Sequence, residues 1–379
     1  MDKSETTIGI ITYHAAYNFG SVLQAYALQK TINSFGFSSE IIDYRTPSQT
    51  SWYQSDISLK YGIIHLIKTI GFIFCLKSRK LRREKYENFI STYLNLSAKR
   101  YTNYTQLNSS ELNYSILISG SDQIWNFACG EFAYESRDAI RPYFLDFGHP
   151  QKRIAYASSI GTQSLNYICQ YAKFLKKFNS LSSRETIGCR YISKAINRDV
   201  VQVVDPTWLL SKGQWDKLPG MYNPSPQRPY ILLYTLNMWN RNIKEWINAI
   251  KKLSQKYNCA IYSISPLTYI KVDGVNCIQD AGPIDILSYI RNAELVITNT
   301  FHGTIFSINL EIPFFSIKAS VGSRQQQILE LCDLENRIIN TPLELENIET
   351  YRCNFQRSSQ AIEKMRTKSI EYIYNAINL

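Results

Sequence analysis

Residues 7–44, which read TIGIITYHAAYNFGSVLQAYALQKTINSFGFSSEIIDY, decide the fold class. Residues 7–14 form an apolar run typical of a buried strand, and residues 38–44 form another. Between them, residues 21–36 carry apolar side chains at helical spacing and end in a glycine, as helices commonly do. Strands separated by helices in this way indicate a parallel sheet with helices on both faces.

The same alternation continues to residue 210, stops, and then begins again. Further strand-like runs are followed by polar loops at residues 114–125, 153–161, 178–188 and 200–210. Four of the 12 prolines then cluster in residues 211–229, which predicts a linker. We therefore expect an N-terminal lobe over 1–210, a C-terminal lobe over 230–355 and a final helix over 356–379. Ligands of open α/β sheets lie beyond the carboxyl ends of the strands, so we expect the active site in a cleft between the lobes.

Length and composition fit a two-domain globular protein. The chain has 379 residues, of which 45% are hydrophobic and 19% are charged. It opens with a polar stretch, MDKSETTIGII, that runs directly into a strand, so we expect no signal peptide and a cytoplasmic protein. The 8 cysteines are scattered without a C-x-x-C pair, which favours reduced thiols over a disulfide framework or a zinc ribbon.

The charge balance favours anionic partners. Lys and Arg total 42 against 31 Asp and Glu, a formal excess of +11. Nucleic acid is not expected as a partner, because no zinc-finger, RNP or basic-helix motif accompanies the charge. Residues 61–76 are mostly apolar but too short to span a bilayer, and a basic stretch from Lys77 to Lys85 follows them. This insertion near 57–100 is either a surface that contacts an anionic membrane or a core helix followed by a solvated helix.

Polar residues stand at the expected strand ends of the N-terminal lobe. After the first strand, a glycine turn and the start of a helix could bind an anion or could be an ordinary N-cap; the residues are Asn18, Gly20 and Ser21. The stretch GSDQIWN could hold a sugar hydroxyl or supply a base, and it could equally form a turn; its candidates are Ser121, Asp122, Gln123 and Trp125.

Two further charged residues lie in loops of this lobe. Arg184, in SSRE, could bind a carboxylate or phosphate with two hydrogen bonds, or it could form an ion pair with Glu185. Asp205, in VVDPT, could cap a short helix or act as an acid or base.

The stretch TNTFHGT contains one of only four histidines, His302. Thr300 and Thr304 flank it, and Gly303 allows a close approach of the backbone. An imidazole exchanges protons near neutral pH, so His302 is the strongest candidate for a proton-transfer residue. Downstream, SVGSRQQQ places Arg324 near the start of another helix, and we expect it to supply a second cation.

Taken in order, five motifs resemble the polysaccharide pyruvyl transferase family. They are IGIITYHAAYNFGSVLQAYALQ, ISGSDQIWN, SSRE, VVDPTWLL and TNTFHGTIFSINLEIPFF, and the similarity runs from about residue 8 to residue 340. The resemblance implies two Rossmann-like lobes arranged as in GT-B glycosyltransferases. It also implies transfer of a pyruvyl group from phosphoenolpyruvate to two hydroxyls of a sugar, which forms a cyclic ketal. The expected acceptor is a glycan, in a lipid-diphosphate-linked form, for surface polysaccharide such as capsule.

The resemblance also assigns roles to residues. His302 matches the family histidine that donates a proton to the enol or contacts the phosphate, and Arg184 matches the arginine that holds the donor. Many members have Arg-Leu-His where this chain has Thr300-Phe301-His302, and Arg324 is our hypothesis for the missing cation. Asp122 or Asp205 is expected to accept a hydroxyl proton. No cofactor and no metal are expected, since no carboxylate–histidine cluster has ligand spacing.

Two other functions are compatible with the sequence. A GT-B glycosyltransferase that uses a nucleotide sugar would share the fold. A non-catalytic carbohydrate-binding or membrane-scaffold protein would explain the 27 tyrosines and the basic segment, but not the polar strand ends.

Overall fold

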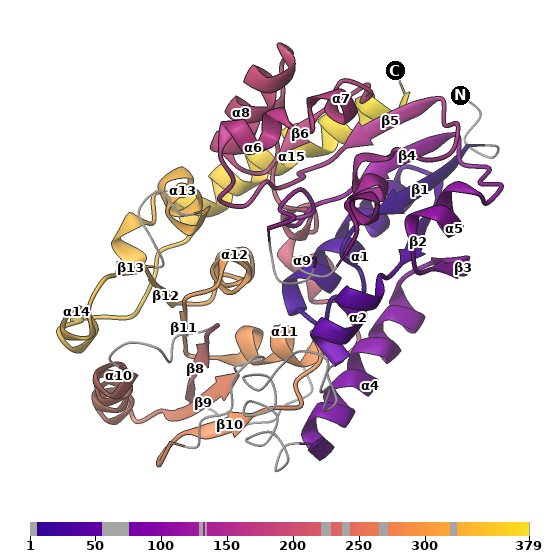
Figure 1. The fold of residues 1–379 in the computed structure, drawn as a ribbon. Helices are drawn as coiled ribbons and strands as arrows, with labels where there is room; N and C mark the ends of the chain where they lie inside the picture. The colour runs from indigo at the N-terminus through magenta and orange to yellow at the C-terminus, as the bar shows by residue number, and fades with distance from the viewer. Residues whose placement is uncertain are drawn as a thin grey trace. The chain divides into compact units, whose positions relative to one another are not determined.

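The computed structural model describes residues 6–54, 76–128, 132, 135–220, 229–236, 243–264, 272–318 and 324–378. Contacts between residues divide the chain into two compact units. The first unit comprises Met1–Asp56, Glu87–Leu210 and Met365–Leu379, and the second comprises Ile57–Tyr86 and Ser211–Lys364. Each unit has its own parallel sheet, which confirms the predicted α/β class (Figure 1).

The first unit is built on a five-stranded sheet in the order β3-β2-β1-β4-β5. Every neighbouring pair is parallel, and Ile10 of the central strand lies opposite Ile41 on one side and Ile118 on the other. The strands are β1 (Thr7–Ile11), β2 (Ser38–Tyr44), β3 (Leu96–Tyr101), β4 (Ile116–Ser119) and β5 (Lys152–Ala155), with a separate short pair, β6 (Ser182–Ser183) and β7 (Val201–Gln202).

Helix α1 (Phe19–Ser34) helps to cover this sheet. Most of its side chains are buried, because apolar residues surround the helix rather than forming a single stripe. The other helices that contribute to the unit are α2 (Pro47–Gln54), α4 (Leu76–Tyr93), α5 (Tyr104–Asn108), η4 (Arg137–Phe144), α6 (Leu165–Cys169), α7 (Ala172–Leu175), α8 (Thr186–Ile196), η5 (Pro206–Trp208) and α15 (Gln356–Asn378). Helices α4 and α15 each begin in the second unit and end in the first.

The C-terminal part of α15 packs on the edge of the first sheet. Tyr372 donates a hydrogen bond from its hydroxyl to the carbonyl of Ala155 in β5 at 3.1 Å. Lys152, at the start of β5, donates to the carbonyl of Ile377 at 2.9 Å. The last residues of the helix are therefore part of the first unit, and Figure 1 shows the yellow ribbon beside β5.

The second unit contains a six-stranded parallel sheet in the order β10-β9-β8-β11-β12-β13. Its strands are β8 (Tyr230–Tyr234), β9 (Ala260–Ile264), β10 (Asn276–Ile278), β11 (Leu295–Thr298), β12 (Phe314–Ile317) and β13 (Ile338–Ile339). Its helices are α9 (Lys212–Trp215), α10 (Ile243–Tyr257), α11 (Pro283–Asn292), α12 (Phe301–Leu310), α13 (Arg324–Leu331), η7 (Glu335–Arg337) and α14 (Pro342–Glu346).

Successive side chains along each strand point to opposite faces of this sheet. Ile231 and Leu233 of β8 join the core that contains Trp246 of α10. Tyr234, one position later, lies on the other face, where its ring approaches Gly303 of α12. The end of β8 therefore contributes a tyrosine to the face where α12 begins.

Some sequence expectations differ from the structure. The run 200–210 was expected to contain a long buried strand that ends at Asp205, but only Val201–Gln202 pair, and Pro206 opens a 3-10 helix. The run 178–188 likewise forms only the two-residue β6. The expected apolar segment 61–75 and much of the linker, 221–228, lie outside the described residues. None of the described helices combines the length and the hydropathy that crossing a bilayer requires.

Candidate functional site

Arg184 is at the centre of a buried ionic cluster in the first unit. Its guanidinium donates hydrogen bonds to Asp205 at 2.6 Å, to Glu185 at 3.1 Å and to Asp122 at 3.4 Å. The Arg184 side chain is only 1% exposed. Burial alone would lower the pKa of Arg184, but the carboxylates of Asp205, Glu185 and Asp122 raise it above its ordinary value. We call these four residues the Arg184 cluster.

The carboxylates of the Arg184 cluster are themselves held by hydrogen bonds. One oxygen of Asp205 accepts from the backbone N–H of Thr207 at 3.0 Å and from its hydroxyl at 2.8 Å. Asp205 therefore caps η5, which is one of the two roles predicted for it. Its other oxygen accepts from Ser121 at 3.3 Å, and Glu185 accepts from Ser159 at 2.5 Å.

Asp122 joins this cluster to the start of α1. It follows β4 and has a φ of 73°, a left-handed conformation that few residue types other than glycine adopt readily. Its carboxylate accepts a hydrogen bond from Ser21, in the first turn of α1. A carboxylate near a helix N-terminus is stabilised by the helix dipole. The start of α1, which the sequence offered as an anion site, therefore already has an anion from the protein itself.

Three other candidate residues of this unit form hydrogen bonds with neighbouring groups of the protein. Asn18 is the N-cap of α1 and accepts from the N–H of Gly20 at 3.0 Å. Gln123 accepts from Asn126 at 2.9 Å. Trp125 is buried, and its indole donates to the carbonyl of Tyr143 at 3.0 Å, so we leave it out of the substrate site proposed below.

A second polar network lies at the carboxyl ends of β1 and β2, and the sequence did not predict it. His14 approaches Asp43 with a distance of 2.9 Å between Nε2 and Oδ1. Asp43 also accepts from Arg45 at 2.5 Å and from Arg100 at 2.9 Å. Burial would raise the pKa of Asp43, but the hydrogen bond to His14 and the charges of His14 and Arg45 hold it well below its usual range.

A small pocket opens beside this network, at the edge of the sheet where α/β proteins bind ligands. Aromatic rings and hydrogen-bonding groups line it, a combination suited to an uncharged polar ligand. The lining residues are Thr12, Tyr13, His14, Ala15, Ala16, Tyr44, Arg45, Gln49, Thr50 and Tyr143. The sequence does hold a signal for this pocket. Polar residues follow or end two neighbouring strands: Tyr13-His14 after β1 and Asp43-Tyr44-Arg45 at the end of β2.

In the second unit, the TNTFHGT stretch forms the end of β11 and the first turn of α12. Thr300 is the N-cap, and its hydroxyl accepts from the N–H of Gly303 at 2.8 Å. The hydroxyl of Thr298 accepts from the N–H of Thr300 at 3.0 Å. Thr304 donates to the carbonyl of Thr300 at 3.0 Å. The hydroxyls therefore build the helix start, with His302 at its second position.

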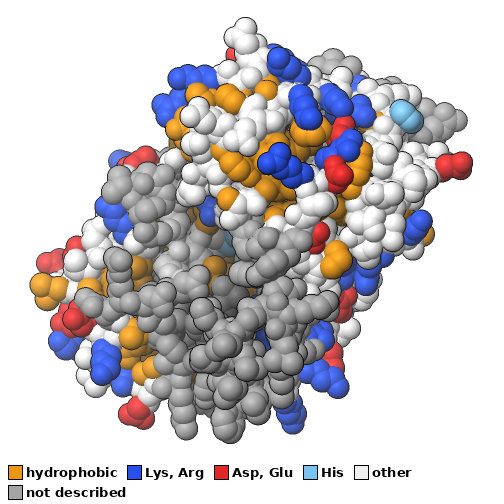
Figure 2. Space-filling model, in the orientation of Figure 1, with side chains coloured by type: hydrophobic (Ala, Val, Ile, Leu, Met, Phe, Trp, Pro, Cys, Tyr) orange, Lys and Arg blue, Asp and Glu red, His pale blue; other side chains and the backbone are white. Residues whose placement is uncertain are grey.

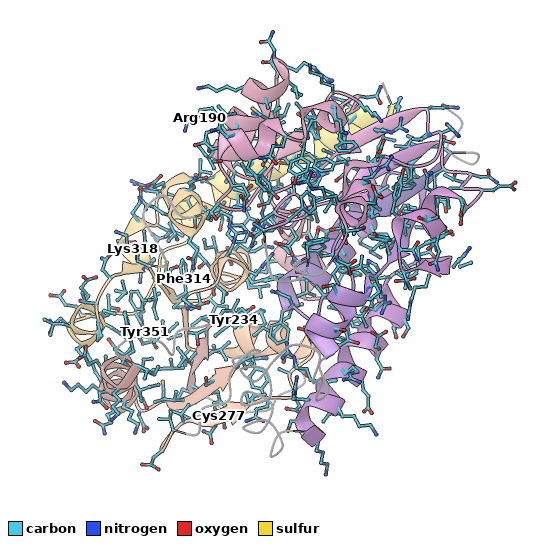
Figure 3. The ribbon with its side chains drawn as sticks, viewed as in Figure 1. Arg190, Tyr234, Cys277, Phe314, Lys318 and Tyr351 are labelled. Atoms are coloured by element: carbon cyan, nitrogen blue, oxygen red, sulfur yellow. The ribbon has the colours of Figure 1, made fainter. Side chains whose placement is uncertain are left out.

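Gly303 is required by packing at this turn rather than by backbone conformation. A Cβ atom there would lie 2.6 Å from the hydroxyl oxygen of Thr300 and 2.8 Å from Cδ1 of Tyr234. Burial raises the pKa of Tyr234 to about 12, against the opposing effect of the neighbouring Thr300 side chain. Tyr234, which Figure 3 labels at the end of β8, is a supporting residue that the sequence did not predict.

Arg324 lies beside the start of α12. Its guanidinium carbon is 5.4 Å from the ring centre of Phe301, and the Phe301 and His302 rings meet edge to face at 5.3 Å. His302 is partly exposed. The structure therefore brings a cation and an imidazole to one helix start, while the predicted residues 320–323 lie outside the described parts of the chain.

No cluster of three or more His, Cys, Asp or Glu side chains suited to a metal ion is found among the residues described.

Two UDP-GlcNAc 2-epimerases are among the solved structures that resemble this fold. UDP-GlcNAc 2-epimerase from Neisseria meningitidis, bound to UDP-GlcNAc, has a TM-score of 0.52 and 8% identity, over 98% of this chain and 99% of that chain. UDP-GlcNAc 2-epimerase from Methanocaldococcus jannaschii has a TM-score of 0.50 and 11% identity, over 98% and 99%. At such identity the likeness shows the fold alone, which is of the GT-B type with Rossmann-like units.

No curated protein matches the sequence. The sequence profile of the family described as "Polysaccharide pyruvyl transferase" matches residues 18–320. The match includes the Arg184 cluster and the start of α12, whereas β1, His14 and Arg324 lie outside it. Since it spans well over half of the 379 residues, the protein belongs to the polysaccharide pyruvyl transferase family and is a transferase enzyme.

Proposed function

We propose that the enzyme transfers a pyruvyl group from phosphoenolpyruvate to two hydroxyls of a sugar and forms a cyclic ketal. One observation carries the proposal: a partly exposed histidine and an arginine lie together at the start of α12. Phosphoenolpyruvate has a phosphate and a carboxylate next to an enol carbon that must be protonated. A helix start and a guanidinium attract the anionic groups, and an imidazole supplies the proton.

The proposed reaction begins at His302. Its imidazolium gives a proton to the methylene carbon, which becomes a methyl group, and the neighbouring carbon takes on positive charge. One sugar hydroxyl forms a bond to that carbon and loses its proton. The C–O bond to phosphate then breaks, the second hydroxyl closes the ring, and the second hydroxyl proton leaves with the phosphate. The donor and a diol are thus converted to the ketal and inorganic phosphate, with no redox change.

Residues of the second unit are proposed to hold the donor. Arg324 pairs with its phosphate or carboxylate, and the N–H groups of the first turn of α12 face the other anionic group, while Thr300 and Thr304, both buried, hold that turn in place. Gly303 keeps the turn close to Thr300.

Residues of the first unit are proposed to serve the acceptor and its protons. Asp122 is the better placed of the two predicted proton acceptors, since its side chain is 11% exposed and that of Asp205 is 2% exposed. Arg184 orients Asp122 in this proposal, because its guanidinium already pairs with three carboxylates. The pocket beside His14 and Arg45 has room for about one water-sized group, so a single hydroxyl of the sugar would enter it. We further propose a lipid-diphosphate-linked glycan as the acceptor, used at the cytoplasmic face of the membrane.

Isothermal titration with phosphoenolpyruvate tests the donor. We expect binding of phosphoenolpyruvate in preference to UDP- and GDP-sugars, and Arg324→Ala should weaken it at least about tenfold, as loss of a charged hydrogen bond does. Arg357→Ala is the matched control, because Arg357 is an exposed arginine of α15 paired with Asp333. Selective binding of a nucleotide sugar would instead indicate a glycosyltransferase, and unchanged affinity in Arg324→Ala would remove Arg324 from the site.

The variant Tyr234→Phe tests the support beneath Thr300. It keeps the ring under Gly303 and removes the hydroxyl next to the N-cap side chain, so phosphoenolpyruvate affinity should fall about threefold to tenfold. Tyr230→Phe is the control, since Tyr230 lies on the same strand and its replacement removes a hydrogen bond to the carbonyl of Tyr289 at 2.7 Å. Equal affinities for the two variants would contradict a specific role for Tyr234.

A further inference from the structure

A group of exposed basic side chains lies on neighbouring helices of the first unit. Lys173 is in α7, Lys176 follows it directly, and Arg190 and Lys194 are in α8. Helices α6 and α7 both pack against α8, so the four side chains belong to one local surface. We call this surface the α7–α8 patch, and Figure 3 labels Arg190 on it.

These four charges are not balanced by acids nearby. Lys177, next to the patch, forms an ion pair with Asp146 at 2.6 Å, and Asp146 also pairs with Arg141 at 2.7 Å. Within the described parts of the chain, no ion pair involves Lys173, Lys176, Arg190 or Lys194. The patch therefore offers about four positive charges to an external anion.

Aromatic rings are interleaved with these charges. Tyr171, Phe174 and Tyr191 are half-buried, and the first two stack on Phe144 with ring centres 5.2 Å apart. The ammonium of Lys173 lies 4.9 Å from the centre of the Phe174 ring, and the Arg190 guanidinium carbon lies 5.6 Å from that of Tyr191. In Figure 2, hydrophobic and basic side chains alternate over the region of α6, α7 and α8.

We propose that the α7–α8 patch docks on an anionic lipid surface. Lys and Arg are attracted to acidic headgroups, and partly exposed Tyr and Phe rings sit at the boundary between headgroups and acyl chains. A purely electrostatic partner would need no rings beside the cations, and a buried protein interface is normally depleted of Lys at its centre. The mixture of the two side-chain types therefore favours a membrane surface over a protein partner.

The basic stretch from Lys77 to Lys85, which the sequence offered for this contact, is less available. Lys85 pairs with Asp285 at 2.8 Å and with Asp280 at 3.4 Å. Lys80 approaches Glu84 at 4.0 Å. Arg82 lies over the ring of the buried Tyr86 at 5.4 Å. Acids of the second unit therefore already pair with Lys80 and Lys85, whereas none pairs with the four basic residues of the α7–α8 patch in the described parts of the chain.

This docking does not depend on the chemistry proposed above. The patch would hold the first unit at a membrane whether the enzyme uses phosphoenolpyruvate or another donor. If the acceptor is lipid-linked, docking would also raise its local concentration at the enzyme.

Vesicle flotation with the full-length protein tests the proposal. Vesicles of phosphatidylcholine with about a third phosphatidylglycerol should bind the wild type, and vesicles of phosphatidylcholine alone should not. The double variants Lys173→Gln/Lys176→Gln and Arg190→Gln/Lys194→Gln should each bind about 25-fold more weakly, on a scale of about fivefold per basic residue. Raising the salt from about 0.1 M to about 0.5 M should weaken wild-type binding, since screening shortens the range of these charges.

The matched control is Lys77→Gln/Lys80→Gln, which removes the same charge from α4. It should bind the anionic vesicles as the wild type does. Loss of binding in this control with retention in the two α7–α8 variants would overturn the proposal and return the contact to α4. Absence of wild-type binding to the anionic vesicles would overturn it outright. Circular dichroism melting of each variant identifies any that fail to fold, and single substitutions at the same positions then replace them.

Discussion

Replacing His302 with alanine is expected to lower kcat at least about 100-fold, the usual scale for a lost general acid. His302 is the second residue of α12. Thr300 is the N-cap of this helix, and Tyr234 packs next to the capping turn. Protonation of the methylene carbon creates the electrophile, so later steps cannot proceed without it. Binding of phosphoenolpyruvate should change much less, because the anionic groups are proposed to rest on Arg324 and the helix N–H groups.

The effect is measured as phosphate release from phosphoenolpyruvate with a glycan acceptor, alongside titration of donor binding. His149→Ala is the control, because His149 is exposed in the first unit. Reaction in D₂O gives an independent readout, since the new methyl group should carry one solvent deuterium. His302→Ala with turnover near that of the control would end the assignment of His302 as the acid.

Replacing Arg184 with methionine is expected to lower the free energy of unfolding of the first unit by about 3–5 kcal/mol, as removal of one partner of a buried ion pair does. Three carboxylates would remain around the site with the guanidinium gone. The serine and threonine hydrogen bonds to Asp205 and Glu185 would not offset that repulsion. The same change would disturb donor binding only indirectly, through the fold.

Urea unfolding followed by circular dichroism measures this loss. Arg190→Met is the control, since exposed substitutions usually change stability by less than about 0.5 kcal/mol. The double variant Arg184→Met/Asp205→Asn should be less destabilised than the sum of the two single variants, because the residues interact directly at 2.6 Å. A stable Arg184→Met protein with sharply reduced phosphoenolpyruvate affinity would instead favour direct donor binding by Arg184.

The sequence predicted the local parts of this fold well. Residues 7–44 formed the strand–helix–strand unit that their apolar spacing indicated, because each element buries side chains at its own period. The run 200–210 contains a shorter strand than expected, Val201–Gln202 alone. Its apolar residues are buried, yet Asp205 and Pro206 turn the backbone into a capped 3-10 helix. A hydrophobic run indicates that a segment is buried. Most of this segment is buried without pairing as a strand.

The site was predictable only where its partners are close in sequence. Thr300, His302 and Gly303 lie within one helical turn, so their grouping could be read directly. The carboxylates around Arg184 come from segments 21 and 62 residues away as well as from its neighbour, and no local pattern encodes that meeting. Tyr234 was missed for the same reason, since strand order brings it to Thr300.

The path of α15 sets an order for synthesis on the ribosome. Residues 211–364 of the second unit are translated before the helix residues that complete the first. Ile373 and Ile377, both fully buried, and the bonds from Tyr372 and Lys152 are absent until residues 372–377 have emerged, after the whole of 211–364. The first unit, although most of it is translated first, therefore lacks this part of its packing until the second unit has been synthesised.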